Sequence, residues 1–467
     1  MTKHDVLKKM EGLITNLMQQ SKIPSLCLHI IEDDKTIYEQ AFGARKLEGN
    51  LPATTDTLYG IGSVTKSFTC LAILQLHQQK KLDIMDSIKE YLPIELGDDE
   101  KPITIHHLMS HSSGVPNLGE ASVLIGRHSD IGEKFVPLSS TNDFYNFINS
   151  SKEEVFVKPG ERFFYFNSGY TLLGLIIEKV TGMKYSEYIT KHILKPLEMN
   201  RSVFDKDKFE QDDNHMTPYF TDREKKFRST MHPFDQLIYA AGGMLSSVNE
   251  LKNYLLMYLQ KGAFKDKKII DEKLLDKMFE SHIERTPGAF GKETYGYGWG
   301  IIENFFGEKM IHHGGSTGVS SAFLAMIPAK NLALALTANV GNSQASMITQ
   351  ALFATLLGKN PQTDHPVLKY SQKIDQLVGT YQFNKGLSKI EISKKGLTLY
   401  AKQIIFKEDE DKEFDFPILH TIDDSENYQF WIPQGPVKIP VEFITNEEKG
   451  TIDMIIERNV YHKASKN

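Results

Sequence analysis

The chain has 467 residues, of which 40% are hydrophobic and 24% charged, and its formal net charge is −6 at pH 7. This length can hold two or three domains with a large buried core, and the composition is that of an ordinary globular protein. The acidic balance argues against a nucleic-acid partner, because no excess of basic side chains is present to neutralise phosphates.

The N-terminal part of the chain predicts a helix followed by a hairpin. Residues 3–21 carry the apolar period of an amphipathic helix, and residues 26–38 predict two short strands around a turn. The first residues lack the continuous apolar core of a signal peptide, and no apolar run is long enough to span a bilayer, so we expect a cytoplasmic protein with no membrane partner. Cys27 and Cys70 lie in apolar runs, which predicts buried thiols rather than a disulfide framework.

The most informative stretch is Ser63-Val64-Thr65-Lys66, which follows a glycine-containing turn and opens a long apolar run. The run predicts a helix that is apolar on nearly all sides and therefore lies between two layers. Residues three apart on a helix share a face, so Lys66 can take the proton of the Ser63 hydroxyl, which is a poor nucleophile until a neighbour does so. Backbone N–H groups at the helix start are free to stabilise an oxyanion. The alternative is a capping serine followed by a surface lysine.

Residues from about 80 to 240 predict most of the remaining helices and hence a mainly helical subdomain. Within it, Tyr165-Phe166-Asn167 follows a Pro-Gly turn and precedes a helix that begins near Ser168. Residues two apart in an extended segment point the same way. A phenol that can relay protons and an amide that can both donate and accept would thus face one side. The alternative is a core aromatic residue beside an N-capping asparagine.

A third motif, His312-His313-Gly314-Gly315-Ser316, precedes a predicted hairpin at 320–338. Paired glycines before a strand let a ligand backbone approach closely. We expect this hairpin to join the sheet of the N-terminal hairpin, with the glycine motif on an edge strand, and a helix over 343–357 to cover the sheet together with the first helix. The alternative is a glycine-rich turn with ordinary histidines.

The histidines His106, His107 and His111 cluster in the sequence and raise the question of a metal site. The spacing lacks the glutamate of an H-E-x-x-H motif, so we predict no metal and no other cofactor.

The pattern changes after residues 358–366, whose glycine, proline and polar residues are typical of a linker. The helical period ends, and short alternating segments follow, which predicts a small antiparallel barrel. The charged run 407–413 is expected to be a solvated loop. The predicted strands lie at 379–383, 389–392, 397–400, 428–432, 441–444 and 452–456.

The three motifs, in this order and spacing, resemble those of the serine β-lactamase and penicillin-binding-protein family. Stretches at 103–116, 169–182, 241–247 and 295–300 are similar to its class C-like branch, and the resemblance covers about 10–358. Within the branch, the chain most resembles an archaeal serine peptidase that acts on peptides containing D-amino acids and carries a C-terminal lipocalin-like barrel. The resemblance implies an α+β fold: a β-lactamase-like hydrolase domain at 1–360 with an antiparallel sheet flanked by helices and a helical subdomain, a linker at 361–370, and a lipocalin-like β-barrel at 371–467.

The resemblance also implies roles for single residues. Ser63 would attack an amide or ester carbonyl to form an acyl-enzyme, with Lys66 as the base and Tyr165 as the proton relay to the leaving group. The N–H groups of Ser63 and Ser316 would form the oxyanion hole. The residues expected to bind the substrate are Asn167, Gly314, Gly315 and Ser316.

One residue departs from the family pattern, since His313 stands where the third motif usually begins with lysine. A lysine there helps to hold the carboxylate of a β-lactam, so β-lactam anchoring is in doubt. Peptidase and esterase members of the branch tolerate histidine here, which implies that His313 joins Tyr165 in proton transfer. An ordinary histidine has a pKa near 6.5, and we expect activity to fall as the pH drops through that value.

The sequence and the resemblance together therefore predict a serine hydrolase that acts through an acyl-enzyme on the amide bonds of small peptides, including peptides that contain D-amino acids. The alternatives are a carboxylesterase with weak β-lactamase activity and a non-catalytic protein that binds peptides or lipophilic ligands. Homo-oligomers are a further expectation, because barrels of this kind border an active site or an oligomer contact in the family that the chain resembles.

Overall fold

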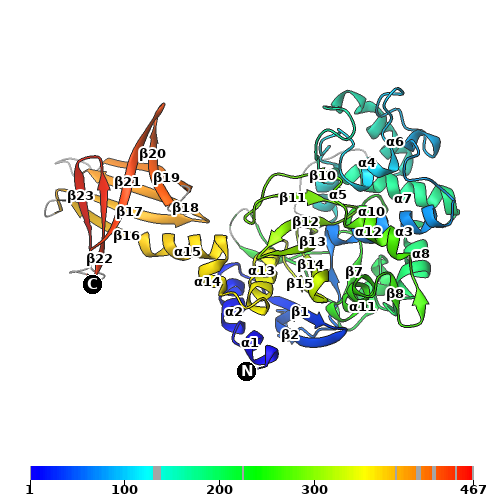
Figure 1. Ribbon diagram of the computed structural model, residues 1–467, viewed down its shortest axis with the longest axis horizontal. Coiled ribbons are helices and arrows are strands. Elements are labelled where there is room, and N and C mark those ends of the chain that lie inside the picture. The colour runs from blue at the N-terminus through cyan, green and yellow to red at the C-terminus, as the bar shows by residue number, and fades with distance from the viewer. Residues whose placement is uncertain are drawn as a thin grey trace. The chain divides into compact units, whose positions relative to one another are not determined.

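The computed structural model describes residues 2–129, 138–222, 224, 226–383, 386–405, 412–422, 428–446 and 450–464. The chain forms two compact units, Met1–Gly358 and Lys359–Asn467 (Figure 1). Most of the charged run at 407–413 lies outside the described residues, and its last two residues belong to a strand rather than to the expected loop.

The first unit is built on a nine-stranded antiparallel sheet with the strand order β10-β11-β12-β13-β14-β15-β1-β2-β3. Strand β1 pairs with β15 from Leu26 to Glu32, so the two predicted hairpins join in one sheet, as expected. The strands are β1 (Ser25–Glu32), β2 (Lys35–Lys46), β3 (Leu51–Pro52), β10 (Ile283–Glu284), β11 (Glu293–Tyr295), β12 (Gly300–Phe305), β13 (Glu308–Ser316), β14 (Ser321–Ile327) and β15 (Leu332–Ala338).

Strand β13 carries the histidine–glycine motif and is not the predicted edge strand, because β12 and β14 pair with its two sides. The pairing with β12 stops at His312, which lies opposite Gly300, the first residue of β12. The pairing with β14 continues to Ser316. Residues 313–316 therefore extend beyond β12, and the strand is locally an edge at the point where the motif lies.

Both faces of the sheet are covered by helices. One face packs on α1 (Lys3–Lys8), α2 (Glu11–Gln20) and α13 (Ala345–Leu356), and the residues between them form one apolar cluster. The single helix predicted at 3–21 is thus two helices. The second and larger apolar cluster lies on the other face, where α3 (Thr65–Gln78) and α11 (Val248–Leu259) pack.

Helix α3 is the central helix of the unit. Its residues from Thr65 to Leu76 are all buried, which is the environment that its uniformly apolar sequence predicts. The helical subdomain packs around it, and the 3₁₀ turn η1 (Gly62–Val64) leads into it. The other helices of the unit are α4 (Ile105–Met109), α5 (Glu120–His128), α6 (Thr141–Ser150), α7 (Asn167–Thr181), α8 (Tyr185–Ile189), α9 (Lys206–Gln211), α10 (Tyr239–Gly242) and α12 (Glu272–Met278).

Three short strand pairs complete the first unit: β4 (Tyr59–Gly60) with β7 (Leu245–Ser246), β5 (Tyr219–Thr221) with β6 (Phe227–Ser229), and β8 (Ala263–Phe264) with β9 (Lys267–Lys268). The first of these pairs matters for the site, because β4 ends three residues before Ser63.

The second unit is a closed antiparallel barrel in which each strand pairs with the next and β16 pairs with β23. Six strands match the predicted segments, whereas β19 and β23 were not predicted. Residues 361–370, expected as a linker, form α14 (Pro361–Asp364) and the start of α15 (Pro366–Leu377). The barrel strands are β16 (Gly379–Phe383), β17 (Ser388–Lys395), β18 (Thr398–Ile405), β19 (Lys412–Ile422), β20 (Tyr428–Gln434), β21 (Val437–Asn446), β22 (Thr451–Ile456) and β23 (Asn459–Lys463).

Among the helices that the structure describes, none combines the length and the apolar character needed to cross a bilayer.

Candidate active site

Ser63 and Lys66 meet at the start of the buried helix α3. Ser63 lies in the turn η1, and the Nζ of Lys66 is 3.1 Å from the Ser63 Oγ. The lysine side chain is 0% exposed, so the alternative of a surface lysine does not describe this residue. The predicted helical spacing thus brings a half-buried serine hydroxyl together with a fully buried amine.

Burial changes the acid–base behaviour of this amine. Removal from water disfavours the charged form and lowers the pKa of Lys66 from 10.5 to about 7, although the nearby Glu120 and Cys70 act in the opposite direction. Glu120 is itself buried, and burial raises the pKa of its carboxyl. Near neutral pH, Lys66 is therefore neutral in about half of the molecules, and can accept a proton.

Two oxygen acceptors hold the lysine in place. Its Nζ donates to the Asn167 Oδ1 at 2.8 Å and to the backbone carbonyl of Ala241 at 2.6 Å. Asn167 is the first residue of α7, and Phe166 rather than Asn167 occupies the N-cap position. The asparagine side chain, expected to orient a substrate, contacts Lys66.

Tyr165 lies beside this pair. The Lys66 Nζ is 4.8 Å from the centroid of the Tyr165 ring. Burial raises the pKa of the Tyr165 phenol above its ordinary value of 10, and hydrogen bonding with the Ser63 side chain and the charge of Arg285 only partly oppose this effect. Tyr165 is therefore a neutral phenol at physiological pH, which suits a proton donor.

His313 is buried, and both of its ring nitrogens have partners. Nδ1 lies 2.7 Å from the carbonyl of Gly314, which can only accept, so this nitrogen carries the proton and Nε2 accepts from the Tyr295 hydroxyl at 2.8 Å. The rings of His313 and Tyr165 are 6.4 Å apart. Histidine and tyrosine are thus neighbours, but the hydrogen bond of His313 is made with Tyr295.

The expectation that His313 has a pKa near 6.5 is wrong. Burial lowers the pKa of His313 well below that value, and the charges of Lys66 and Arg285 lower it further, against the hydrogen bond to Gly314. The imidazole is consequently neutral across the ordinary pH range and places no cation where the family usually has one.

The glycines of the third motif allow β13 to lie directly against the turn η1, which carries Ser63 and is called the nucleophile turn below. A Cβ on Gly315 would be 1.9 Å from the Ile61 carbonyl oxygen and 2.8 Å from the Ser63 nitrogen. A Cβ on Gly62, whose φ is +53°, would be 2.4 Å from the Ser316 nitrogen. The backbone nitrogens of Ser63 and Ser316 therefore both lie where the turn η1 and strand β13 contact each other. Gly314, by contrast, is exposed. The Ser316 hydroxyl donates to the Gly341 carbonyl at 2.8 Å.

The structure also brings in residues that sequence reasoning missed. Arg285 lies over the rings of Phe163 and Tyr295, at 5.3 and 5.9 Å from their centroids. The signal for three of the missed groups was present, since the Ala241 carbonyl, Tyr295 and His111 fall within stretches that resemble the family. The missed groups are the Ala241 carbonyl, Tyr295, Arg285, Glu120 and His111.

The three clustered histidines each have a partner within the protein. The Nδ1 of His106 is 2.6 Å from the Tyr297 hydroxyl, that of His107 is 2.9 Å from the Thr104 hydroxyl, and that of His111 accepts from a backbone N–H. These bonds tie one ring nitrogen of each histidine to a neighbouring residue or segment.

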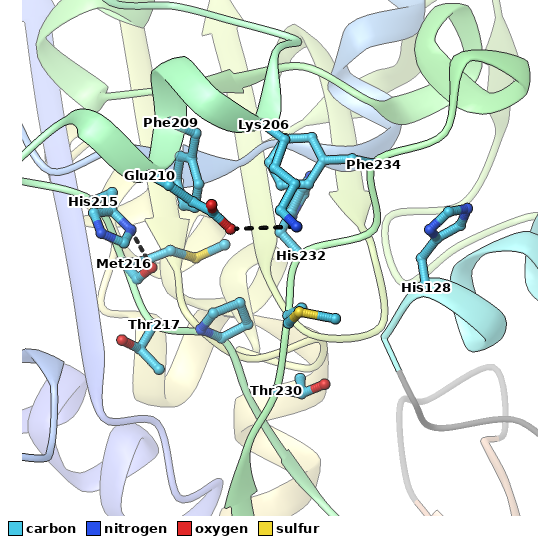
Figure 2. A pocket seen from close by; sticks show the side chains of 12 residues that line it. His128, Lys206, Phe209, Glu210, His215, Met216, Thr217, Thr230, His232 and Phe234 are labelled. Atoms are coloured by element: carbon cyan, nitrogen blue, oxygen red, sulfur yellow. Dashed lines mark hydrogen bonds and ion pairs between the residues drawn. The ribbon is translucent and has the colours of Figure 1, made fainter.

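A separate cavity of about 390 Å³ lies between α9 and the chain around β5 and β6 (Figure 2). Its lining includes Phe209, Phe234 and the buried His232, neither of whose ring nitrogens has a hydrogen-bond partner among the described residues. A Cβ on Gly60 would be 2.3 Å from this ring, so His232 lies directly against the strand that leads to Ser63. The His232 ring therefore lines the cavity and also contacts the strand that precedes Ser63.

A serine in contact with a buried lysine at the start of a helix, facing a strand of an antiparallel sheet, is typical of β-lactamase and penicillin-binding-protein-like serine hydrolases. The chain belongs to the Beta-lactamase family, whose sequence pattern matches residues 10–359. Residues 361–462 match the Pab87 octamerisation domain. The resemblance inferred from the motifs and the predicted fold class are both confirmed.

Similar proteins extend this result. The octameric penicillin-binding protein homologue from Pyrococcus abyssi has 36% sequence identity and a TM-score of 0.90, covering 98% of this chain and 100% of that one. Protein flp of Staphylococcus aureus is 26% identical over 360 residues, which are 75% of this chain and 66% of that protein, so the chain spans less than two thirds of its length. A D-stereospecific amidohydrolase from Streptomyces sp. has the same fold at 22% identity and a TM-score of 0.60, covering 73% of this chain and 98% of that one.

Proposed function

We propose that this chain is a serine hydrolase that acts through an acyl-enzyme on the amide bonds of peptides, including peptides with D-amino acids. The observation that carries the proposal is the contact of Ser63 with the buried Lys66, with a distance of 3.1 Å and a lysine pKa of about 7. A base with this pKa can take the serine proton at ordinary pH. The shared fold of the D-stereospecific amidohydrolase supports the substrate class.

The hydrogen bonds of Lys66 support its role as the base. A neutral amine has two N–H groups and one lone pair. Asn167 Oδ1 and the Ala241 carbonyl can only accept, so they take the two N–H groups. The lone pair is then left for the third neighbour, the Ser63 hydroxyl. In this arrangement Asn167 orients Lys66, in addition to the expected contact with the substrate.

The proposed reaction has two halves. In acylation, the Ser63 oxygen attacks the carbonyl carbon, its proton passes to Lys66, and the negative charge on the carbonyl oxygen is stabilised by the N–H groups of Ser63 and Ser316. The bond to the leaving amine then breaks as Tyr165 donates a proton to its nitrogen and regains one from Lys66. In deacylation, water attacks the ester, loses its proton to the same groups, and releases Ser63.

The neutral His313 favours a second candidate, a carboxylesterase with weak β-lactamase activity. His313, and not a lysine, precedes Gly314 and Gly315 on the strand beside Ser63, and burial keeps the pKa of His313 well below 6.5. Substrates that need a cation at this position, such as β-lactams, would bind poorly, whereas neutral esters would not be affected.

We also propose that the chain forms a homo-oligomer. The support is the match of residues 361–462 to the Pab87 octamerisation domain and the octameric state named for the homologue from Pyrococcus abyssi. Static light scattering on the full chain tests this, and a monomeric mass over a wide concentration range would refute it.

A substrate panel tests the function. We would measure the turnover of D- and L-aminoacyl p-nitroanilides, p-nitrophenyl esters and nitrocefin by the wild type and by Ser63→Ala. The matched control is Ser140→Ala, which removes the hydroxyl that caps α6. We expect turnover of D-aminoacyl anilides that Ser63→Ala abolishes and Ser140→Ala preserves. Turnover of esters alone would favour the carboxylesterase, and binding without any turnover would favour a non-catalytic binding protein.

A further inference from the structure

His111 accepts hydrogen bonds from the backbone on both sides of Tyr165. Its backbone carbonyl accepts from the N–H of Phe164 at 2.9 Å, and its Nδ1 accepts from the N–H of Phe166 at 3.0 Å. These are the two residues that flank Tyr165. His111 itself is fully buried and has a φ of +58°, a left-handed conformation that is uncommon for a residue other than glycine. One residue thus fixes the backbone N–H groups of both residues that flank the tyrosine.

The imidazole ring also packs on the tyrosine ring. The two centroids are 4.2 Å apart with an angle of 35° between the planes, and the rings of Tyr170 and Tyr295 lie at 4.9 and 5.0 Å. Because Nδ1 accepts a hydrogen bond, the proton of the neutral ring is on Nε2, which has no hydrogen-bond partner in the described part of the chain. The ring therefore contacts Tyr165 through its face and leaves the phenol hydroxyl free for Ser63.

The charge state of His111 fits this arrangement. Burial lowers the pKa of His111 well below 6.5, and the charges of Lys66 and Arg285 act in the same direction. A protonated ring would lose the acceptor at Nδ1 and release the Phe166 N–H. The imidazole is therefore held in the form that makes the contact.

We propose that His111 is a positioning residue that holds the Tyr165 hydroxyl in line with Ser63 and the leaving group, through the two backbone hydrogen bonds and the ring contact. This inference rests on the proposed serine hydrolase activity. A displacement of about 1 Å in a group that transfers a proton can reduce a rate by about 100-fold. Loss of the Nδ1 acceptor should have an effect of that size wherever the reaction depends on Tyr165.

The chemistry of the leaving group separates positioning from a merely structural role. An amide leaves as an amine and needs a proton, whereas p-nitrophenolate leaves as an anion and needs none. We would therefore measure kcat/KM for the p-nitroanilide and the p-nitrophenyl ester of the same N-acetyl-D-amino acid. His111→Leu should lower the value for the anilide about 30- to 100-fold and the value for the ester less than about threefold. Equal losses for both substrates would overturn the proposal.

His111→Asn provides the matched variant. Asparagine tolerates the left-handed conformation and its Oδ1 can accept from the Phe166 N–H, so it should recover most of the anilide activity that His111→Leu loses. If His111→Leu fails to fold, as judged by circular dichroism, the anilide-to-ester ratio of His111→Asn and of His111→Gly, which keeps the backbone conformation without the acceptor, decides the question. Similar ratios in these two variants would refute the role of the acceptor.

A Tyr165→Phe background completes the test. If His111 acts through the phenol, His111→Leu should change kcat/KM for the anilide by less than about twofold in that background, because the two losses are not additive. Full additivity would mean that His111 acts elsewhere. Failure of the hydrolase proposal would give a different result, because hydrolysis would then survive Ser63→Ala in the wild-type background. If hydrolysis depends on Ser63, the hydrolase proposal holds, and the His111 variants test the positioning role alone.

Discussion

The pKa of Lys66 gives the sharpest test of the site. With a pKa of about 7 rather than 10.5, about half of the Lys66 side chains are neutral at pH 7, instead of about one in 3,000, which is a gain of about 1,500-fold in the reactive form. The lowering of the pKa of Lys66 from 10.5 to about 7 corresponds to a free energy on the order of 5 kcal/mol, which comes from burial. The reactive form is the neutral one, so it is lost as the pH falls.

The assay is the rate at which a fluorophosphonate labels Ser63 between pH 5 and 10. We expect the rate to reach half of its maximum near pH 7 and to fall about tenfold per pH unit at lower pH. Lys66→Arg keeps the positive charge but cannot lose its proton, so labelling should slow by about 100- to 10,000-fold and lose this pH dependence. Circular dichroism would show that the variant is folded.

The reasoning would be refuted by either of two results. A labelling rate in the wild type that still rises tenfold per unit between pH 8 and 10 would mean that Lys66 keeps its ordinary pKa. The same limb near pH 7 in Lys66→Arg would assign the titration to another group, and His313 would not be that group, because its pKa lies well below 6.5.

Four further predictions concern the surroundings of the pair. Asn167→Asp places a carboxylate at the atom 2.8 Å from the Lys66 Nζ, stabilises the ammonium form and should move the acidic limb of kcat/KM up by at least one pH unit; an unmoved limb would contradict the contact. His313→Lys adds a cation near Lys66, so that limb should move to lower pH while nitrocefin turnover improves, and a nitrocefin kcat/KM that stays at the wild-type value would show that the missing cation does not limit β-lactam binding. Gly315→Ala introduces a Cβ 1.9 Å from a carbonyl of the nucleophile turn and should slow Ser63 labelling at least tenfold, unless crystallography shows the turn unmoved. A chain that ends at Gly358 should keep Ser63 labelling but show a lower oligomeric mass by light scattering; loss of labelling in a folded truncated chain would mean that the barrel unit contributes to the site.

Local sequence patterns predict the parts of the fold that depend on neighbours in the chain. The apolar period around Ser63 predicted a buried helix with Lys66 on the same face, because both facts follow from helix geometry. The alternation of the barrel segments predicted six strands. Strand β19 was missed because it begins with charged residues and contains Pro417, which break the alternation.

The segment expected to be a linker shows how one signal can have two meanings. Pro361 and Pro366 were interpreted as linker residues, but each is the first residue of a helix. The N–H of a first helical residue has no partner within the helix, so proline loses no hydrogen bond at this position. Single residues with turn composition therefore do not distinguish a linker from a helix start.

The parts of the site that could not be predicted depend on contacts between distant segments. Asn167 and Ala241 are 101 and 175 residues from Lys66 along the chain, and no local pattern indicates that both would accept from its amine. The depressed pKa of His313 likewise follows from burial and from the charges of other elements. From the sequence alone, only the ordinary pKa of a histidine could be expected for His313, because the groups that lower it come together only in the folded protein.

The assembly of the Lys66 environment from distant segments has a consequence for the life of the chain before it is folded. In an extended or partly folded chain the lysine is solvated, its pKa is near the ordinary value of about 10.4, and the serine beside it has no base at neutral pH. Reactivity appears only when α3 has been enclosed by segments that are synthesised 101 and 175 residues later. A nascent or damaged copy of this hydrolase therefore carries Ser63 without a neutral base beside it, so that activation of the serine depends on folding.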